Sequence, residues 1–227
     1  GSDDTVKIPS IGLSKNDGAL IYAQLDAAKP VSVTMFNKKP FKDSSWDNAI
    51  VAHEWGHYIS NRLVGNSSGL INQQGRSMGE GWGDFHALLV ISEADDALIP
   101  GNELFQKPYA AITYVASFYS GIRNYPYSTN MDVNPLTFGN VELNKGTSAD
   151  QYGNAEVHDA GEPWAAMLWD CYVSLINDER YTFAEARSMM MSYLVAAYKM
   201  TPIAPTYTEA RDALLAAAYA NEPKDYE

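Results

Sequence analysis

Residues 53–57 read His-Glu-Trp-Gly-His, and this pentapeptide constrains the chain more than any other segment does. Apolar residues recur every three or four positions around it, which predicts a helix over about 45–63. Side chains four residues apart lie on one face of a helix, so His53 and His57 can converge on a single Zn²⁺. Glu54 lies about 100° further round the helix, where it can reach a water held at the ion. The spacing therefore predicts a zinc site with a carboxylate base beside it.

Catalytic zinc takes three protein ligands and keeps one position open, so this motif requires a further ligand. The next helix, predicted over 78–93, provides one, because Glu80 and Asp84 lie four residues apart on one of its faces. A Glu ligand followed one turn later by an Asp that can hydrogen-bond a ligating histidine is a recurring arrangement at metal sites. The alternative is that these acids only favour a helix N-terminus through the helix dipole. Beside two histidines with metal-ligand spacing, the metal interpretation is the stronger one.

The remaining histidines receive different interpretations. His86 follows Asp84 by two residues and so lies on another face of the helix, which is typical of a packed core histidine. His158 comes at the end of an irregular stretch and just before a helix, where a loop-borne group can donate to the oxyanion of a tetrahedral intermediate. A third zinc-binding histidine six residues after His57, the metzincin pattern, is excluded because positions 60 and 63 are Ser60 and Leu63.

Elsewhere the pattern predicts a mainly α fold with a short β-containing N-terminal segment, divided into residues 3–44 and a helical catalytic domain over 45–227. Short strands are expected at Val6–Ile8, Ala19–Ala23 and Val31–Phe36. Further helices are expected over 108–121, from Gly161 to about Ile176, and from capping boxes at Thr182 and Thr206 to about 198 and 220. Loops are expected over 64–77 and 123–153. Trp55, Trp82 and Trp164 are interpreted as core residues, with lining of a cleft as the alternative.

Composition excludes several classes of protein. The chain has 16 Lys and Arg against 28 Asp and Glu, a net charge of −12, and no basic run, so nucleic acid and anionic membranes are not expected partners. The longest apolar stretch, Tyr109 to Ile122, is shorter than the roughly 20 residues that a bilayer span needs. Cys171 is the only cysteine, which rules out an intrachain disulfide or a cysteine zinc site. No signal peptide follows Gly1-Ser2, so we expect a chain that is intracellular or already processed.

Four segments together resemble the fungalysin family of secreted zinc metallopeptidases, which are thermolysin-like gluzincins. They are His53-Glu-Trp-Gly-His57-Tyr-Ile-Ser-Asn-Arg-Leu63, Met78-Gly-Glu80-Gly-Trp-Gly-Asp84-Phe85, Arg123-Asn-Tyr-Pro-Tyr-Ser-Thr129, and Glu156-Val-His158 with Gly161-Glu-x-Trp164. The resemblance covers about Trp46 to Ala220. It implies a secreted endopeptidase that cleaves proteins or peptides, with zinc on His53, His57 and Glu80, Glu54 as base and Asp84 orienting a histidine.

The same resemblance implies His158 as the transition-state donor and Arg123 as a residue that holds a substrate carbonyl, with a loop-anchoring salt bridge as the alternative for Arg123. Thermolysin has a second donor, a tyrosine, and here either a tyrosine of the 109–152 region replaces it or His158 acts with less help. Calcium sites among the Asp and Asn side chains stay an open alternative.

The family places a β-rich lobe before the zinc helix, and with only about 44 residues ahead of that helix we expect most of the lobe to be absent from this chain. Residues Ile8 to Leu20 resemble the tail of a protease-associated domain, with two ordinary strands as the alternative. The competing function is therefore a zinc-binding subdomain that lacks activity of its own and needs the missing lobe. The chain's own propeptide and that lobe are its expected protein partners. A gluzincin aminopeptidase is a weaker alternative, because no Gly-x-Met-Glu-Asn-like segment precedes the zinc helix.

Overall fold

The computed structural model describes residues 15–32, 42–141 and 156–226, and it divides into two units, Gly1–Phe41 and Lys42–Glu227. The described part of the smaller unit contains one helix, α1 (Lys15–Asp26). The strand expected over Ala19–Ala23 is wrong: these residues lie inside α1, whose Ala, Leu and Gln residues favour a helix. The strand expected at Val6–Ile8, and all but the first two residues of the one at Val31–Phe36, lie outside the described residues.

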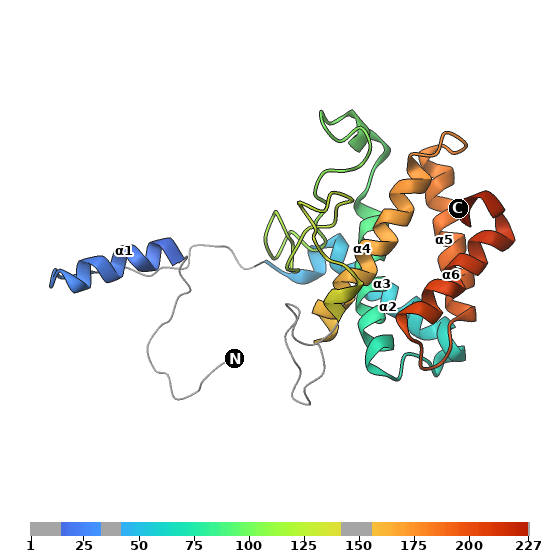
Figure 1. Ribbon diagram of the computed structural model, residues 1–227, viewed down its shortest axis with the longest axis horizontal. Helices are drawn as coiled ribbons and strands as arrows, with labels where there is room; N and C mark the ends of the chain where they lie inside the picture. The colour runs from blue at the N-terminus through green and yellow to red at the C-terminus, as the bar shows by residue number, and fades with distance from the viewer. Residues whose placement is uncertain (1–14, 33–41, 142–155, 227) are drawn as a thin grey trace. The chain divides into compact units, whose positions relative to one another are not determined.

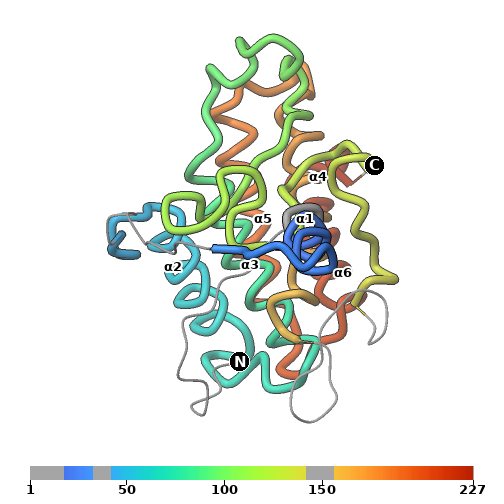
Figure 2. Tube along the Cα trace, turned by 90° about the vertical axis from the view of Figure 1, so that its left-hand side faces the viewer, coloured from blue at the N-terminus to red at the C-terminus, as the bar shows by residue number. Residues whose placement is uncertain are grey.

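The larger unit is built from helices, which confirms the mainly α fold class. They are α2 (Asn48–Leu63), α3 (Gln73–Ile91), α4 (Val157–Ile176), α5 (Phe183–Met200) and α6 (Tyr207–Asn221). Helix α3 is central: α2 packs along one side of it and α4 along another, while α5 packs against α4 and α6 (Figures 1 and 2). Short 3₁₀ helices cover Ser44–Trp46, Val64–Ser67, Ala94–Leu98, Phe138–Val141 and Pro223–Tyr226. None of the helices described here is both long and apolar enough to cross a bilayer.

Side-chain caps explain where these helices begin. The carboxylate of Asp47 accepts a hydrogen bond from the N–H of Ala49 and starts α2. Asn72 does the same for Gly75, so α3 starts at Gln73 rather than at Met78 and takes up part of the predicted loop over 64–77. The capping boxes predicted at Thr182 and Thr206 are both confirmed.

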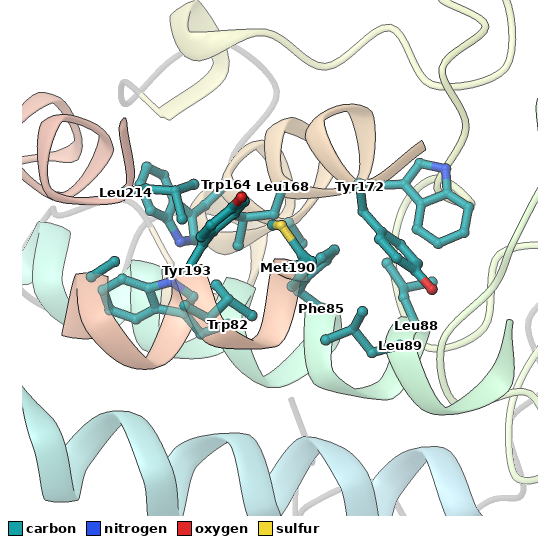
Figure 3. Close-up of a cluster of buried hydrophobic side chains, with 14 of the residues drawn as sticks. Trp82, Phe85, Leu88, Leu89, Trp164, Leu168, Tyr172, Met190, Tyr193 and Leu214 are labelled. Atoms are coloured by element: carbon teal, nitrogen blue, oxygen red, sulfur yellow. The ribbon is translucent and has the colours of Figure 1, made fainter. Parts of the chain in front are cut away.

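The core lies between α3, α4 and α5, with α6 contributing at one end (Figure 3). Its large buried side chains include Trp82, Phe85 and Leu88 from α3, Trp164, Leu168 and Tyr172 from α4, Met190 and Tyr193 from α5, and Leu214 from α6. Trp82 makes edge-to-face contacts with Trp164 and Tyr198, which confirms the core interpretation of Trp82 and Trp164. Burial of these large apolar side chains holds α3 against α4 and α5.

The helix predicted over 108–121 is wrong. This stretch contains two residues with left-handed backbone, Ile112 (φ 61°) and Gly121 (φ 64°), and isolated β-bridges pair Tyr109 with Tyr127 and Ser117 with Gly121. Aromatic and β-branched residues dominate it, and these have low helix propensity. Instead, the backbone N–H of Tyr114 donates a hydrogen bond to the carboxylate of Asp47, which lies at the start of α2. Irregular structure was correctly predicted for 123–141, apart from the short 3₁₀ helix, and 142–153 lies outside the described residues.

Candidate metal centre

The two histidines of α2 point to one place. His53 is buried and His57 is half-buried, and their rings meet edge to face with centroids 4.6 Å apart. The i, i+4 spacing puts both on the side of α2 that faces α3. The first two residues of the candidate site therefore come from one turn of one helix.

Pairs of glycines let the three helices that form the site approach closely. A Cβ atom built on Gly56 of α2 would lie 2.9 Å from the Cα of Gly83 on α3. A Cβ on Gly81 would lie 2.5 Å from the carbonyl oxygen of Gly161 on α4. Real Cβ atoms do not come so near to backbone, so larger residues would push these helices apart. The glycines between the acids of α3 thus bring Glu80 to the histidines.

Glu80 completes a cluster of metal-ligand atoms. Its Oε2 atom lies 3.3 Å from Nε2 of His53 and 3.5 Å from Nε2 of His57. That oxygen is buried and has no hydrogen-bond partner, which is costly unless something else binds it. Two ligand atoms on one tetrahedral zinc ion lie about 3.4 Å apart, given bonds of roughly 2.0–2.1 Å. The three residues fit a zinc ion, and they form the one such group found in the described part of the chain.

Asp84 contacts the far side of His53. Its Oδ1 atom lies 2.8 Å from Nδ1 of His53, so Nε2 of that ring is left facing the cluster. Burial lowers the pKa of His53, but the hydrogen bond with Asp84 and the nearby Glu80 outweigh it and raise the pKa to about 9. Burial raises the pKa of Asp84, while His53 and Arg123 bring it down to about 2. A metal ion would therefore displace a proton from His53 on binding at neutral pH.

The Glu80 carboxylate is held ionised by the groups around it. Burial alone would raise its pKa, but His53, His57 and His158 hold the pKa well below its usual range. Two imidazoles and an ionised carboxylate are a donor set that recurs at catalytic zinc sites.

His158 reaches the cluster from the start of α4. Its side chain is 48% exposed, and its Nε2 atom lies 3.3 Å from Oε2 of Glu80. Its Nδ1 atom lies 2.7 Å from Oε1 of Glu156, whose other oxygen accepts the N–H of His158 and of Asp159 as the helix cap. Glu156 was missed as a site residue, although a carboxylate at a helix start two positions before a histidine was a usable signal. This pair orients the ring toward the three predicted ligands.

Arg123 lies within the site as an ion pair. Its side chain is 6% exposed, and Nε and Nη2 lie 2.6 and 2.9 Å from the two oxygens of Asp84. Nη2 also lies 3.8 Å from Oε2 of Glu80. The hydroxyl of Tyr127 donates a hydrogen bond to Asp84 over 2.5 Å, and the side chain is fully buried. This tyrosine of the 109–152 region therefore binds Asp84. Sequence reasoning did not assign Tyr127, because only the tertiary structure brings it to α3.

The remaining predicted residues fall into two groups. Glu54 is exposed and borders an open groove of about 660 Å³ that residues of α2 and α3 line. Trp55, 57% exposed, lines the same groove, so the core interpretation is wrong for this tryptophan. His86 is buried and its Nε2 atom lies 3.1 Å from the Tyr198 hydroxyl, which confirms it as a core histidine. Burial lowers the pKa of His86 to about 4, so this ring stays neutral.

Comparison with known proteins identifies the family. The family model described as fungalysin metallopeptidase (M36) matches residues 1–226. The chain belongs to the fungalysin metallopeptidase family. The resemblance seen in the four motifs is thereby confirmed, and the family implies a metal-dependent protease.

Curated fungalysin relatives carry names that agree with this assignment. Extracellular metalloproteinase 2 of Trichophyton tonsurans and of Arthroderma benhamiae are each 32% identical to this fungalysin chain over 196 residues, which is 80% of the chain and 28% of either relative. Extracellular metalloproteinase 9 of Coccidioides posadasii is also 32% identical over 196 residues, which is 80% of the chain and 28% of that relative. The chain thus spans about 28% of the length of the relatives it matches.

Proposed function

We propose that this chain is the zinc-binding part of a secreted endopeptidase that hydrolyses internal peptide bonds of proteins. The observation that carries the proposal is the convergence of His53, His57 and the unpartnered Glu80 oxygen at ligand-to-ligand distances. Family membership supports it, and the names of the relatives support secretion. Secretion is tested by locating the native protein: we expect it in the culture medium rather than in the cells.

In this mechanism His53, His57 and Glu80 hold the ion, and Asp84 keeps His53 in the tautomer whose Nε2 faces the ion. Zinc, when bound, activates water and polarises the scissile carbonyl as a Lewis acid. Glu54 lies next to His53 on α2, takes the proton of the attacking water and delivers it to the leaving amine. His158, held by Glu156, donates a hydrogen bond to the oxyanion as it forms. Arg123 holds a substrate carbonyl from its position on Asp84.

The first experiment is cleavage of an N-terminally blocked, internally quenched peptide by the purified chain, with its zinc content measured. We expect one zinc per chain and turnover that is lost with a chelator. Glu54→Gln should keep the zinc and lose turnover by several orders of magnitude, because the amide cannot accept the proton. A chain without zinc contradicts the proposal. Activity only on peptides with free N-termini would instead indicate an aminopeptidase.

A second candidate function is a metal-binding subdomain that needs an upstream lobe for activity. An exposed apolar surface beside Glu54 supports it: Val51, Trp55 and Tyr58 of α2 are exposed and, with Val90 of α3, line the open groove. Contiguous exposed apolar side chains commonly mark an interaction site. This candidate predicts stoichiometric zinc without turnover for the chain alone, and turnover once the longer protein is used.

A further inference from the structure

Glu162 is a buried carboxylate that none of the roles above uses. It lies on α4 one turn after His158 and is only 1% exposed. Its Oε1 atom accepts hydrogen bonds from the backbone N–H of Asn124 at 3.0 Å and from Nδ2 of Asn124 at 2.8 Å. Its Oε2 atom is buried without a hydrogen-bond partner. Burial raises the pKa of Glu162 to about 7, despite the bonds from Asn124 and the charge of Arg123, which lower it. Burying a carboxylate costs free energy unless other groups bind it, so the partners of Glu162 indicate its role.

The residue that Glu162 holds is the direct neighbour of Arg123. Arg123 places two nitrogens on Asp84 of α3, while Asn124 places its nitrogens on α4, with Nδ2 also 2.9 Å from Oδ1 of Asp159. Consecutive loop residues are therefore attached to two different helices of the candidate site. The surrounding loop, up to the 3₁₀ helix at 138–141, has no helix or paired strand of its own beyond the isolated bridges. Side-chain hydrogen bonds thus decide where this part of the loop lies.

The contacts form a continuous path to a predicted metal ligand. It runs from Glu162 to Asn124, along the chain to Arg123, then to Asp84 and to Nδ1 of His53. Every side chain on the path except that of Asn124 is at least nine-tenths buried, so a shift at one end leaves charged groups unpaired at the other. Arg123 has the longest side chain on the path and loses the most conformational entropy when it is ordered, so a fixed backbone at this position favours its ion pair with Asp84 most.

We propose that Glu162 is a positioning residue of the metal centre: it fixes Asn124, so that Arg123 stays on Asp84 and Asp84 stays on His53. This inference rests on the proposed function, in which His53, His57 and Glu80 hold a metal ion. The alternative is that Glu162 only satisfies the Asn124 backbone and contributes stability without any effect on the centre.

The test measures Co²⁺ affinity and the visible absorption of bound Co²⁺ in the purified full chain, neither of which needs turnover. Glu162→Ala removes the acceptor and should weaken Co²⁺ binding about tenfold, the lower end of the effect of outer-shell partners, and change the absorption spectrum. Glu162→Gln keeps an oxygen for Asn124 and should stay within about threefold of wild type. Asp170→Ala, at an exposed carboxylate further along α4, is the matched control and should match wild type.

A double mutant tests the route. If Glu162 acts through Arg123, then Arg123→Ala combined with Glu162→Ala should bind Co²⁺ no more weakly than Arg123→Ala alone. Additive losses overturn the route, and a folded Glu162→Ala chain with wild-type affinity and spectrum overturns the inference. A Glu162→Gln chain as impaired as Glu162→Ala also overturns it, because the hydrogen bonds are then irrelevant. Should Glu162→Ala fail to fold, Asn124→Ala, which loses only the amide bonds, should still weaken Co²⁺ binding about threefold, and wild-type affinity there contradicts the inference.

The outcomes separate this inference from the function on which it rests. A wild-type chain that binds no Co²⁺ or Zn²⁺ overturns the proposed function itself. Tight binding by wild type together with unchanged binding by the Glu162 variants overturns only the positioning role.

Discussion

At the scale of single residues, Asp84 is the acceptor that joins three side chains of the site. It is 1% exposed and accepts hydrogen bonds from His53, Arg123 and Tyr127. Its charge compensates that of Arg123, which is also buried. Asp84 therefore has two expected roles, in holding the fold together and in orienting a metal ligand.

We expect Asp84→Asn to reduce the free energy of unfolding by about 3–5 kcal/mol, because the buried Arg123 loses its counter-charge. Zinc affinity should fall by roughly 10–100-fold. Chemical denaturation and metal competition measure the two effects. Asp178→Asn is the control, since the Asp178–Arg180 pair is partly exposed and should cost no more than about 1 kcal/mol. An Asp84 variant as stable as this control contradicts the prediction.

Glu162 should make stability depend on pH. Its pKa is about 7 in the folded chain against an ordinary value of 4.5, so the folded state binds the proton more tightly than the unfolded state. The stability from that proton is complete below about pH 4.5 and is lost as the pH rises through 7. Glu162→Gln lacks this loss, so the variant should gain on wild type between pH 5 and pH 8, by up to about 3 kcal/mol. Urea denaturation of both chains at several pH values measures the difference, and a difference independent of pH contradicts it.

At the scale of helices, the spacing of glycines in α3 decides how closely its neighbours approach. Gly81 and Gly83 face the backbone of α4 and the ring of His53, respectively, with no room for a Cβ atom. Gly79 differs, because the nearest atom to its Cβ position is Cδ1 of Leu70 at 3.8 Å, an ordinary contact. The same residue type in the same helix therefore has different roles at positions only two residues apart.

We expect Gly81→Ala to destabilise the chain by about 1–3 kcal/mol, despite the higher helix propensity of Ala, because the methyl group meets the Gly161 carbonyl oxygen. Gly79→Ala should be neutral or stabilising by up to about 1 kcal/mol. Thermal or urea unfolding of the two variants side by side measures this. Equal effects at the two positions would show that helix approach does not depend on Gly81.

Element boundaries also show where local reasoning succeeds. The helices around His53 and from Thr182 and Thr206 follow from periodicity and capping residues, which act over a few positions. In the stretch 108–121 the spacing of apolar residues suits a helix, whereas its aromatic and β-branched residues disfavour one. Its course depends on contacts such as that of Asp47 with the N–H of Tyr114, between residues far apart in sequence.

At the scale of the whole molecule, a metal ion would join α2 to α3, the central helix of the larger unit. Bound ligand stabilises a fold by about 2.7–4.1 kcal/mol at 100–1,000 times its dissociation constant. Removal of the metal by a chelator should therefore lower the melting temperature by roughly 5–15 °C. Differential scanning calorimetry checks this, with re-added zinc as the control. His57→Ala should melt at the same low temperature with and without chelator, and a wild-type chain indifferent to chelator contradicts the prediction.

The sequence by itself determined the candidate ligands and the family. His53 and His57, like Glu80 and Asp84, are related by the repeat of a single helix, and that geometry is local. The tertiary structure decided the rest: that Asp84 accepts from Arg123 and Tyr127, that Glu162 holds Asn124, and that Trp55 is exposed while Trp82 and Trp164 are buried. These features depend on which helices approach one another and how closely, and a periodicity within one helix carries no information about the surface it meets.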